Sequence, residues 1–554
     1  MEESNDCAYL REFATTNQCE LMFALNLHVE GVGLLQEEVR AVRQVTDTVE
    51  SLLQHIVNKI RKSVKNLKEN AAENSDSDLK VPISLTNGFT ENIRGKTVLK
   101  NLINSNIGAI RFQIFDQSYF VVINAPLVKE IKLPLILYAH FTVQASKLFC
   151  LFTDHSSSQF SWFKSKDKEN WTQVATTSKY KIKHDDIDHY LKLVCVPCNS
   201  VLTGPSAEAI SENKVELIGD LPTCPFEERH KFTSQPSNNN CFRVVSYNVL
   251  SNRYTDSADS FPYCPPKFLA IDYRKQLITK ELLGYKADVI CLQEVDSSVF
   301  TTYYKDIFKN AGYMSFYHKK GNKSSEGLAC FFNKTRFKKV DDHQIIYSNE
   351  IKKKLYTHLW NFVKVNPDLR DLFMRQLTSL HVTVLKLKLA KKSHTLIFGN
   401  THLFYRPEHE LVRILQINMA TTYLQSLNQN YSQNNSVKVI LCGDFNSIPT
   451  SAVYDYVANG KLHKNHPVFQ NTKNHPILFH NFQFESACGT PTYTNYTENF
   501  KNCLDYIFIE KNKLKVNKVV PFPTEEELGN YIGCPNEVYP SDHLALVADL
   551  KLAT

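Results

Sequence analysis

The feature that most constrains the fold is a series of short apolar runs in the second half of the chain, each ending or beginning at a polar residue. The clearest run is the stretch from Val437 to Pro449, VKVILCGDFNSIP. A short apolar run bounded by turn residues predicts a buried strand. In α/β proteins, the polar residues at the carboxyl end of such a strand are often those that bind ligands. Taken alone, the stretch is equally compatible with a buried strand that ends in an Asp-containing turn.

Similar runs recur from residue 241 to the end of the chain. Further strands are predicted over 242–248 (FRVVSYN), 288–294 (DVICLQE), 327–333 (GLACFFN), 395–403 (TLIFGNTHL), 504–510 (LDYIFIE) and 544–550 (LALVADL). Between them, apolar residues at helical spacing predict helices at about 270–284, 297–311, 351–373 and 408–427. Strands and helices in this order predict that residues 241–554 form an α/β sandwich of two packed sheets with helices outside.

The polar residues at the ends of these runs are carboxylates, amides and imidazoles. They are Asn248, Glu294, His402, Asp444, Asn446, Asp505, Asp542 and His543. A buried polar group without a partner costs about 1 to 3 kcal/mol, so we expect these side chains to converge in one site. Carboxylate and amide oxygens favour Mg²⁺, with Mn²⁺ as a substitute, over zinc. Mg²⁺ suits phosphate substrates, and a histidine beside a carboxylate supplies general acid–base catalysis.

Two motifs of other enzyme classes do not occur in the sequence. There is no GxxxxGK[ST] segment, which argues against a P-loop nucleotide site. There is also no GxSxG segment, which argues against an α/β-hydrolase.

The composition is that of a globular protein with several domains, because 554 residues are 43% hydrophobic and 22% charged. No apolar run reaches the roughly 18 to 20 residues of a membrane helix, so we expect no membrane insertion. Residues 231–554 carry 39 Lys and Arg against 28 Asp and Glu, a net charge of +11, whereas 1–230 carry a net −4. A basic carboxyl-terminal part favours a polyanionic substrate, although a solvated Lys-rich surface explains the charge equally well.

The 14 cysteines are scattered along the chain, and several lie inside strand-like runs. Buried free thiols in a reducing compartment are the favoured interpretation. The pair Cys195 and Cys198 lacks a second CxxC or a spaced histidine pair, so a structural role is favoured over a zinc site.

The first part of the chain predicts two modules without catalysis. Residues 1–130 alternate strand-like pieces with a helical stripe from Asp47 to Val64 and a polar loop over 65–78, which predicts a small α+β module. Residues 131–228 contain short strands at regular spacing and predict an immunoglobulin-like β-sandwich, with Trp162 and Tyr190 as core aromatics. The polar stretch 229–240 predicts a linker to the catalytic domain at 241–554.

Six motifs in the second half carry a resemblance to a known family. SYN, LQEV, NTHL, GDFN, LDYIF and SDH, in this order, resemble the endonuclease/exonuclease/phosphatase superfamily. The resemblance implies a DNase I-like four-layer α/β sandwich. EGLACFF at 326–332 and YTNYTENFKNCLDYIF at 493–508 are similar to the nocturnin and carbon-catabolite-repressor deadenylase branch, and most closely to the 2′-phosphodiesterases that degrade 2′,5′-oligoadenylate.

The resemblance also implies roles for the polar residues at the strand ends. Glu294 would be the principal Mg²⁺ ligand with Asn248 beside it, and Asp542 an acid on the metal side. Asp444 and Asn446 would align the attacking water, contact the phosphate and complete the metal site, with a second ion near Asp444 as the alternative to a single ion. His402 would hydrogen-bond a phosphate oxygen, and Asp505 would orient His543.

Substrate contacts are implied for four further residues. Phe500 and Pro407 occupy the positions that sandwich the terminal adenine in the deadenylase branch, and Glu326 and Asn495 are candidates for sugar or base contacts. Packing of Phe500 on the core is the alternative. The basic segment 351–373 is expected to cover one sheet edge as an exposed helix, with a nucleic-acid channel as the alternative.

The expected activity is that of a Mg²⁺-dependent 3′-end exoribonuclease that releases 5′-AMP from 2′,5′-oligoadenylate and from poly(A). The alternatives are a nucleotide phosphatase or cyclic-phosphate processing enzyme of the same fold, and an inactive RNA-binding adaptor. Apart from the RNA substrate no partner is deducible, and we expect a monomer. Family resemblance indicates the mitochondrial matrix. The cytoplasm is the alternative, because residues 1–20 carry Arg11 against five acidic residues and lack presequence features.

Overall fold

The computed structural model describes residues 7–13, 16–29, 33–70, 79–88, 91–105, 109–217, 220–237, 241–255, 260–321, 324–388, 394–432, 436–473 and 476–553. The chain divides into two compact units, Met1–Val215 and Glu216–Thr554. In the described residues, no helix is long and apolar enough to cross a membrane. All 14 cysteines are free thiols.

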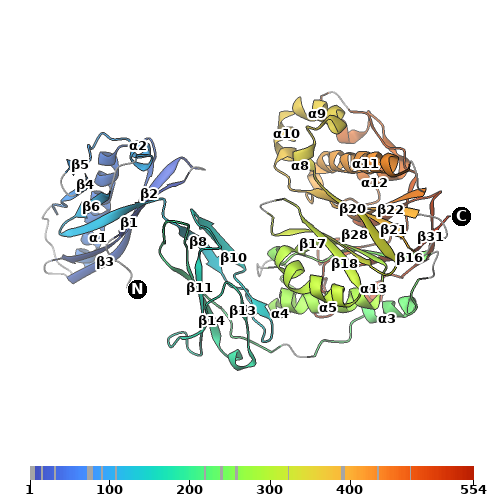
Figure 1. Ribbon diagram of the computed structural model, residues 1–554, viewed down its shortest axis with the longest axis horizontal. Helices are drawn as coiled ribbons and strands as arrows, with labels where there is room; N and C mark the ends of the chain where they lie inside the picture. The colour runs from blue at the N-terminus through green and yellow to red at the C-terminus, as the bar shows by residue number, and fades with distance from the viewer. Residues whose placement is uncertain are drawn as a thin grey trace. The chain divides into compact units, whose positions relative to one another are not determined.

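The first unit contains a seven-stranded sheet in the order β3-β2-β1-β7-β6-β4-β5, followed by smaller sheets. Its elements are β1 Cys7–Phe13, β2 Gln18–Val29, β3 Gly33–Gln44, α1 Val49–Asn70, β4 Ile83–Asn87, β5 Glu91–Asn92, α2 Leu99–Ile103, β6 Ile110–Ile114, β7 Gln117–Ile123, β8 Leu127–Lys132, β9 Thr142–Val143, β10 Lys147–Leu151, β11 Gln159–Ser165, β12 Thr172–Ala175, β13 Tyr180–Lys181, β14 Tyr190–Val196 and β15 Ala207–Ile210. The apolar stripe of α1 packs on the large sheet through Val49, Leu52, Ile56 and Ile60 (Figure 1).

Three details of the first unit differ from expectation or refine it. Helix α1 runs to Asn70, so the loop predicted from residue 65 begins later, and its remainder at 71–78 lies outside the described residues. Trp162 is fully buried as predicted, but the aromatic packed beside it is Tyr180, with ring centroids 6.0 Å apart. Tyr190 is only half-buried, and the Lys168 ammonium lies 4.2 Å from the centroid of its ring.

From β8 onward, the first unit has a four-stranded sheet, β12-β11-β14-β15, and two strand pairs, β10-β8 and β13-β9. Their shared core contains Trp162, Tyr180, Leu193 and Cys195. No third ligating side chain joins Cys195 and Cys198 among the residues that the structure describes. The immunoglobulin-like assignment and the predicted domain boundaries stay predictions.

The second unit holds two six-stranded sheets, β18-β19-β17-β16-β31-β30 and β20-β21-β22-β23-β29-β26. Its main elements are α3 Phe226–His230, β16 Cys241–Asn248, α4 Pro266–Leu269, α5 Ile271–Gly284, β17 Val289–Asp296, α6 Ser297–Val299, α7 Lys305–Asn310, β18 Tyr313–Lys319, β19 Glu326–Asn333, β20 Phe337–Ile346, α8 Tyr347–Glu350, α9 Thr357–Lys364, α10 Pro367–Met374, β21 Ser379–Leu387, β22 His394–His402, α11 Glu410–Ser432, β23 Ser436–Asp444, α12 Ala452–Asn459, β24 Lys461–Leu462, β25 Leu478–Phe479, β26 Phe484–Ser486, β27 Asn495–Tyr496, β28 Lys501–Asn502, β29 Asp505–Glu510, β30 Leu514–Val519, α13 Glu525–Gly529 and β31 Leu546–Leu552.

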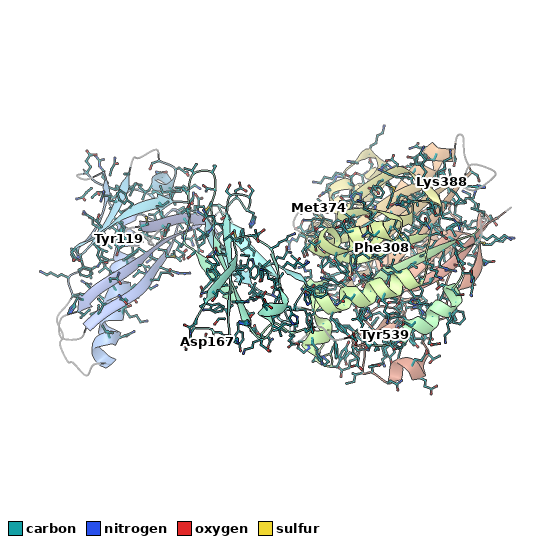
Figure 2. All side chains as sticks on the ribbon, turned by 60° about the horizontal axis from the view of Figure 1, so that its bottom comes forward. Tyr119, Asp167, Phe308, Met374, Lys388 and Tyr539 are labelled. Carbon is teal, nitrogen blue, oxygen red and sulfur yellow. The ribbon has the colours of Figure 1, made fainter. Side chains whose placement is uncertain are left out.

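These elements form the predicted four layers, with the two sheets face to face and helices on both outer faces (Figure 1). Apolar side chains of both sheets, such as Val244 and Phe398, share one core between them. Helices α5 and α7 cover the first sheet, where Phe308 is fully buried (Figure 2). Helices α9 to α12 cover the second sheet. Strands buried on both faces explain why their sequences read as continuous apolar runs.

Strand direction brings the polar strand ends together. In the first sheet β16 and β17 are parallel and pair Asn248 with Gln293, and β31 runs antiparallel to β16 from the same edge. In the second sheet β22 and β23 are parallel and pair His402 with Asp444, while antiparallel β29 pairs Asp505 with Asp444. His402, Asp444 and Asp505 therefore stand in one row at the edge of the second sheet.

Two segments of the second unit differ from the sequence expectation. The helix predicted over 351–373 is interrupted, because Pro367 starts a new helix after α9 ends at Lys364. Its apolar side packs on the face of the second sheet, where Leu359 and Phe362 join the core under α11. The segment predicted as a linker, 229–240, begins inside a helical stretch over 226–233, and Arg229 in it donates to carbonyl oxygens of the second unit at Pro521 and Ala545.

Candidate active site

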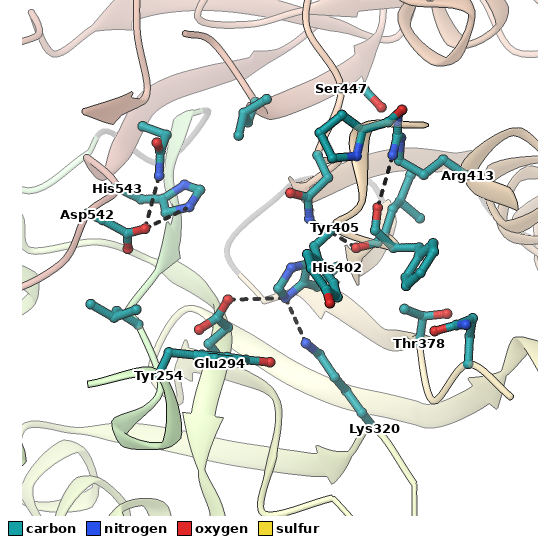
Figure 3. Close-up of a pocket in the computed structure, with 18 of the residues that line it drawn as sticks. Tyr254, Glu294, Lys320, Thr378, His402, Tyr405, Arg413, Ser447, Asp542 and His543 are labelled. Atoms are coloured by element: carbon teal, nitrogen blue, oxygen red, sulfur yellow. Dashed lines mark hydrogen bonds and ion pairs between the residues drawn. The ribbon is translucent and has the colours of Figure 1, made fainter. Parts of the chain in front are cut away.

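A cleft of about 1100 Å³ opens over the row of polar strand ends in the second unit. Figure 3 shows Glu294, His402 and His543 directed into it from three different strands or strand ends. Its lining contains nine of the twelve residues expected from the sequence: Glu294, Glu326, His402, Pro407, Asn446, Asn495, Phe500, Asp542 and His543. The remaining three, Asn248, Asp444 and Asp505, lie beneath the cleft and bind residues that line it.

Asn248 ties the two sheets together at the base of the cleft. Its side-chain amide donates to Glu294 Oε1 at 3.1 Å and to Asp444 Oδ2 at 3.0 Å. Its own oxygen accepts a hydrogen bond from the Leu250 amide. A neutral donor between two buried carboxylates holds both in place without adding charge.

The backbone at Glu294 is adapted to aim its side chain into the cleft. Glu294 has a φ of +56°, a conformation that L-residues seldom adopt. The pairing of β17 with β19 shifts register between Leu292 and Val295, so Glu294 lies in a bulge. Bulges redirect side chains near active sites, and strain of this kind persists where the surrounding structure enforces it.

His402 lies beside the Glu294 carboxylate and is linked through Lys320 to a second carboxylate, that of Glu326. Its Nδ1 lies 2.8 Å from Lys320 Nζ and 3.8 Å from Glu294 Oε1 (Figure 3). Lys320 in turn donates to Glu326 Oε1 at 3.2 Å. Burial, together with the Lys320 ammonium, lowers the pKa of His402 well below its usual value. The ring is therefore neutral at physiological pH, and the Lys320 contact to Nδ1 leaves the ring proton on Nε2, 3.4 Å from Asp444 Oδ2.

The arrangement of these acids fits a divalent cation. Glu294, Glu326 and His402 each offer a ligand atom within 4.8 Å of the others. Burial and the nearby Glu326 charge raise the pKa of Glu294 to about 8. Glu326 Oε2 is buried and has no hydrogen-bond partner among the residues that the structure describes. A cation would relieve the repulsion and satisfy that oxygen, and oxygen ligands suit Mg²⁺ or Mn²⁺.

The other side of the cleft holds a carboxylate–histidine pair. Asp505 Oδ2 accepts from His543 Nδ1 at 2.8 Å and from the Thr494 hydroxyl at 2.6 Å. Burial alone would lower the pKa of His543, but the carboxylates of Asp505, Asp542 and Asp444 hold it well above its usual value. His543 Nε2 lies 3.7 Å from Asp444 Oδ2 and 3.9 Å from Asp542 Oδ2 (Figure 3).

Asp444 and Asn446 occupy the turn after β23. The Asn446 amide donates to Asp444 Oδ1 at 2.8 Å, and the Asn446 side chain donates to the Leu403 carbonyl at 3.0 Å. Burial, followed by the Asp505 charge, raises the pKa of Asp444 to about 6. A carboxylate with that pKa can accept a proton near neutral pH.

All four residues expected to contact substrate line the cleft. Phe500 exposes 42% of its surface, so it is not packed into the core. Asn495 donates to Asp542 Oδ2 at 3.1 Å, and Glu326 binds Lys320 and the Tyr254 hydroxyl. The roles assigned to these residues stay predictions.

Lys320 and Tyr254 were missed by the sequence reasoning. Lys320 lies in the lysine-rich stretch HKKGNK and Tyr254 in a short helical turn, and neither is at the end of an apolar run. The signal available for Lys320 is its position directly after a strand that precedes EGLACFF.

The four layers and the cluster of acids and imidazoles at one sheet edge define a phosphoesterase. Comparison with known proteins agrees: the Endonuclease/Exonuclease/phosphatase family matches residues 245–543. The chain belongs to this family.

Among the relatives, the 2′,5′-phosphodiesterase 12 of Homo sapiens is 34% identical over 490 residues, which are 83% of this chain and 79% of the relative. The CCR4-Not complex 3′-5′-exoribonuclease subunit Ccr4 of Schizosaccharomyces pombe is 29% identical over 393 residues, 63% of this chain and 54% of the relative. Of the solved structures, ANGEL2, a 2′,3′-cyclic phosphatase, has a TM-score of 0.48 and 23% identity over 57% of this chain and 96% of its own. The chain is thus an enzyme, a hydrolase of the phosphodiesterase and exoribonuclease class.

Proposed function

We propose that the chain is a Mg²⁺-dependent 3′-end exoribonuclease that releases 5′-AMP from 2′,5′-oligoadenylate and also from 3′,5′-linked poly(A). The observation that carries this proposal is the 34% identity to 2′,5′-phosphodiesterase 12 over 83% of the chain. A match of that length must reach well into both compact units. Activity on 3′,5′-linked RNA is supported by the relatives named CCR4-Not complex 3′-5′-exoribonuclease subunit Ccr4.

Glu294, Asp444, Asn446 and Asp542 would hold the Mg²⁺ ion, with Asn248 orienting the first two. The proximity of Glu326 to Glu294 and His402 supports a cation on that side of the cleft. A bound Mg²⁺ would stabilise negative charge on the oxygens of the scissile phosphate.

In the proposed reaction, Asp444 and Asn446 position a water molecule for attack on phosphorus. Asp444 would accept the proton that this water loses. As the new P–O bond forms, the bond from phosphorus to the 2′- or 3′-oxygen of the preceding nucleotide breaks. That oxygen takes up a proton, so the products are 5′-AMP and an oligonucleotide shortened by one residue.

The two histidines would act on the phosphate with different charge states. Neutral His402 offers its Nε2–H to a phosphate oxygen as a hydrogen-bond donor. His543, held as an imidazolium by Asp505, offers a charge-assisted hydrogen bond, which is about twice as strong as a neutral one. Asp505 is a positioning residue in this scheme, because it contacts His543 and not the substrate.

Phe500 and Pro407 would hold the terminal adenine between them. Stacking on an aromatic ring contributes about 1 to 3 kcal/mol per base and tolerates different bases. Selectivity for adenine would then come from polar residues beside the ring, for which Asn495 and Glu326 are the candidates.

The substrate class is tested by incubation with 2′,5′- and 3′,5′-linked adenylate trimers in Mg²⁺, with and without chelator. We expect AMP to accumulate with a ladder of shortened products, and chelation to stop the reaction. Release of inorganic phosphate without AMP would favour a nucleotide phosphatase, and conversion of a terminal cyclic phosphate alone would favour the processing enzyme. Either result would overturn the exonuclease proposal.

The metal assignment is tested by Glu294→Ala. Loss of one hydrogen bond to the transition state lowers the rate by roughly 10²- to 10³-fold. We expect a larger fall in AMP release for Glu294→Ala, because this variant loses both the cation and the contact with Asn248. The matched control is Glu526→Ala, at an exposed glutamate of α13. Circular dichroism should show both variants folded, and turnover by Glu294→Ala equal to that of the control would contradict the assignment.

A further inference from the structure

A second group of ligating side chains lies outside the cleft. It consists of His318 on β18, Asp342 on β20 and His381 on β21. None of the three lines the cleft. Strand β18 is an edge strand of the first sheet and β20 an edge strand of the second, so this group bridges the two sheets at one side of the sandwich.

We propose that His318, Asp342 and His381 form a Zn²⁺ site. Two imidazole nitrogens and one carboxylate oxygen are a ligand set that zinc prefers, whereas Mg²⁺ prefers oxygen ligands alone. The carboxylate of Asp342 and the His381 ring are almost fully buried, while 27% of the His318 side chain is exposed. The exposed side leaves an entry path and a fourth position for water.

The three side chains need little movement to hold an ion. The Nε2 atoms of His318 and His381 lie 2.7 Å and 2.8 Å from the two oxygens of Asp342. In a tetrahedral site with Zn–N and Zn–O bonds of about 2.0 to 2.1 Å, neighbouring ligand atoms are about 3.3 Å apart. An outward shift of about half an ångström per contact therefore makes room for the ion.

The donor atoms of the group already face one another. Both histidine Nε2 atoms are directed at the Asp342 carboxylate, one at each of its oxygens. Zinc binds imidazole nitrogens and carboxylate oxygens in their proton-free forms, so metal binding would replace these two hydrogen bonds.

The tautomer of His381 is not fixed from its other side. His381 Nδ1 is buried and has no hydrogen-bond partner in the described part of the chain. No hydrogen-bond donor at Nδ1 therefore fixes the ring proton on Nε2. The ring can carry its proton on Nδ1 instead, and Nε2 is then free to bind a metal. The Thr383 hydroxyl, 3.2 Å from His381 Nε2 and 3.4 Å from Asp342 Oδ1, stands beside both ligand atoms.

The same strand supplies a matched control. His343 and Asp341 also form a pair, at 3.2 Å, but 46% of the Asp341 side chain is exposed and the pair belongs to none of the three-residue groups in the described structure. Since a zinc site needs at least three protein ligands, this pair should not bind the ion.

The test is zinc binding by the full-length protein after removal of metals by a chelator, in buffer with excess Mg²⁺. The assay uses a Glu294→Gln background to reduce binding in the cleft, and compares it with the same protein carrying His318→Ala or His343→Ala. We expect His318→Ala to bind one zinc fewer than the other two proteins. Equal zinc content in all three would overturn the proposal.

Two further readouts do not depend on turnover. Co²⁺ should give a visible absorption band typical of a low-coordinate site in the parent and in His343→Ala, and no such band in His318→Ala. Zinc should raise the melting temperature of the parent but not of His318→Ala, because an ion that joins β18 to β20 and β21 binds only the folded state. Absence of the Co²⁺ band in the parent would overturn the proposal even where His318→Ala is poorly folded.

Discussion

His402 and His543 face the same carboxylate oxygen of Asp444, but the first ring is neutral and the second is cationic. His402 Nε2 lies 3.4 Å from Asp444 Oδ2 and His543 Nε2 lies 3.7 Å from it. The difference arises from what binds each Nδ1: Lys320 repels a proton on His402, whereas Asp505 attracts one to His543. The same side-chain type thus supplies a neutral donor and a cationic donor within one cleft.

His480 allows a test of stability against pH away from the cleft. It is buried beside Tyr456, and burial lowers its pKa from 6.5 to about 4. As the pH falls below 6.5, the unfolded chain takes up a proton that the folded chain refuses until about pH 4. Stability from the neutral ring is therefore complete above pH 6.5 and is lost toward pH 4, by about 3 kcal/mol at 1.36 kcal/mol per pKa unit.

The measurement is urea unfolding at pH 7 and pH 4.5 for the wild type and His480→Asn. Asparagine does not titrate, and its oxygen can replace Nδ1 as the acceptor for the Phe482 amide, which lies 3.2 Å away. We expect the wild type to lose more stability than His480→Asn between the two pH values. A parallel loss in both proteins would show that other groups account for the acid sensitivity.

At the scale of the element, the turn after β23 depends on Gly443. Its φ is +142°, and a Cβ there would lie 1.9 Å from the Thr401 carbonyl oxygen of β22. Gly443→Ala should therefore destabilise the protein by about 3 kcal/mol or more, the range of severe steric changes. It should also lower activity, because Asp444 follows directly and pairs with His402.

Gly399→Ala is the control for this change. Gly399 lies on β22 and has an ordinary φ, and its added Cβ would meet side-chain ends only, those of Leu424 at 3.1 Å and Leu380 at 3.4 Å. Thermal unfolding should separate the two variants clearly. Equal melting temperatures for Gly443→Ala and Gly399→Ala would contradict the steric argument.

The sequence predicted β16, β17, β19, β22, β23, β29 and β31, because strands buried on both faces leave continuous apolar runs. It did not predict β21 or the partly exposed edge strands β18, β20 and β30. The sequence also predicted that Asp444, His402 and Asp505 meet, since their strands end or begin at one edge. Tyr254 could not be predicted, because loops and turns carry no periodicity that reveals which way a side chain points. Lys320 offered one signal, its position directly after a strand, but the lysines beside it in the same stretch offered nothing to tell them apart. Pro367 marks the break between the two helices in the sequence. The helical spacing of apolar residues continues past it, so a single helix was predicted.

At the scale of the whole molecule, every residue of the cleft belongs to the second unit. That unit also includes the residues before β16. Arg229 donates to the carbonyl oxygens of Pro521 and Ala545, at 2.9 Å and 2.7 Å, and its guanidinium lies 3.6 Å from the buried Glu281. Because Ala545 is two residues from His543, these contacts support the strand end that carries a candidate catalytic residue.

We therefore expect a fragment of residues 216–554 to fold and to hydrolyse an adenylate dimer, whereas a fragment of 241–554 should be much less stable. Removing Arg229 leaves Glu281 buried without its cationic partner, which costs about 3 to 5 kcal/mol. Urea unfolding of both fragments measures the difference, and Arg229→Ala in the full chain isolates the contribution of that side chain. The shorter fragment and Arg229→Ala should both unfold at lower urea than their parents. If the fragments beginning at 216 and 241 unfold at the same urea concentration, residues 216–240 contribute nothing to the catalytic unit, and the expectation is wrong.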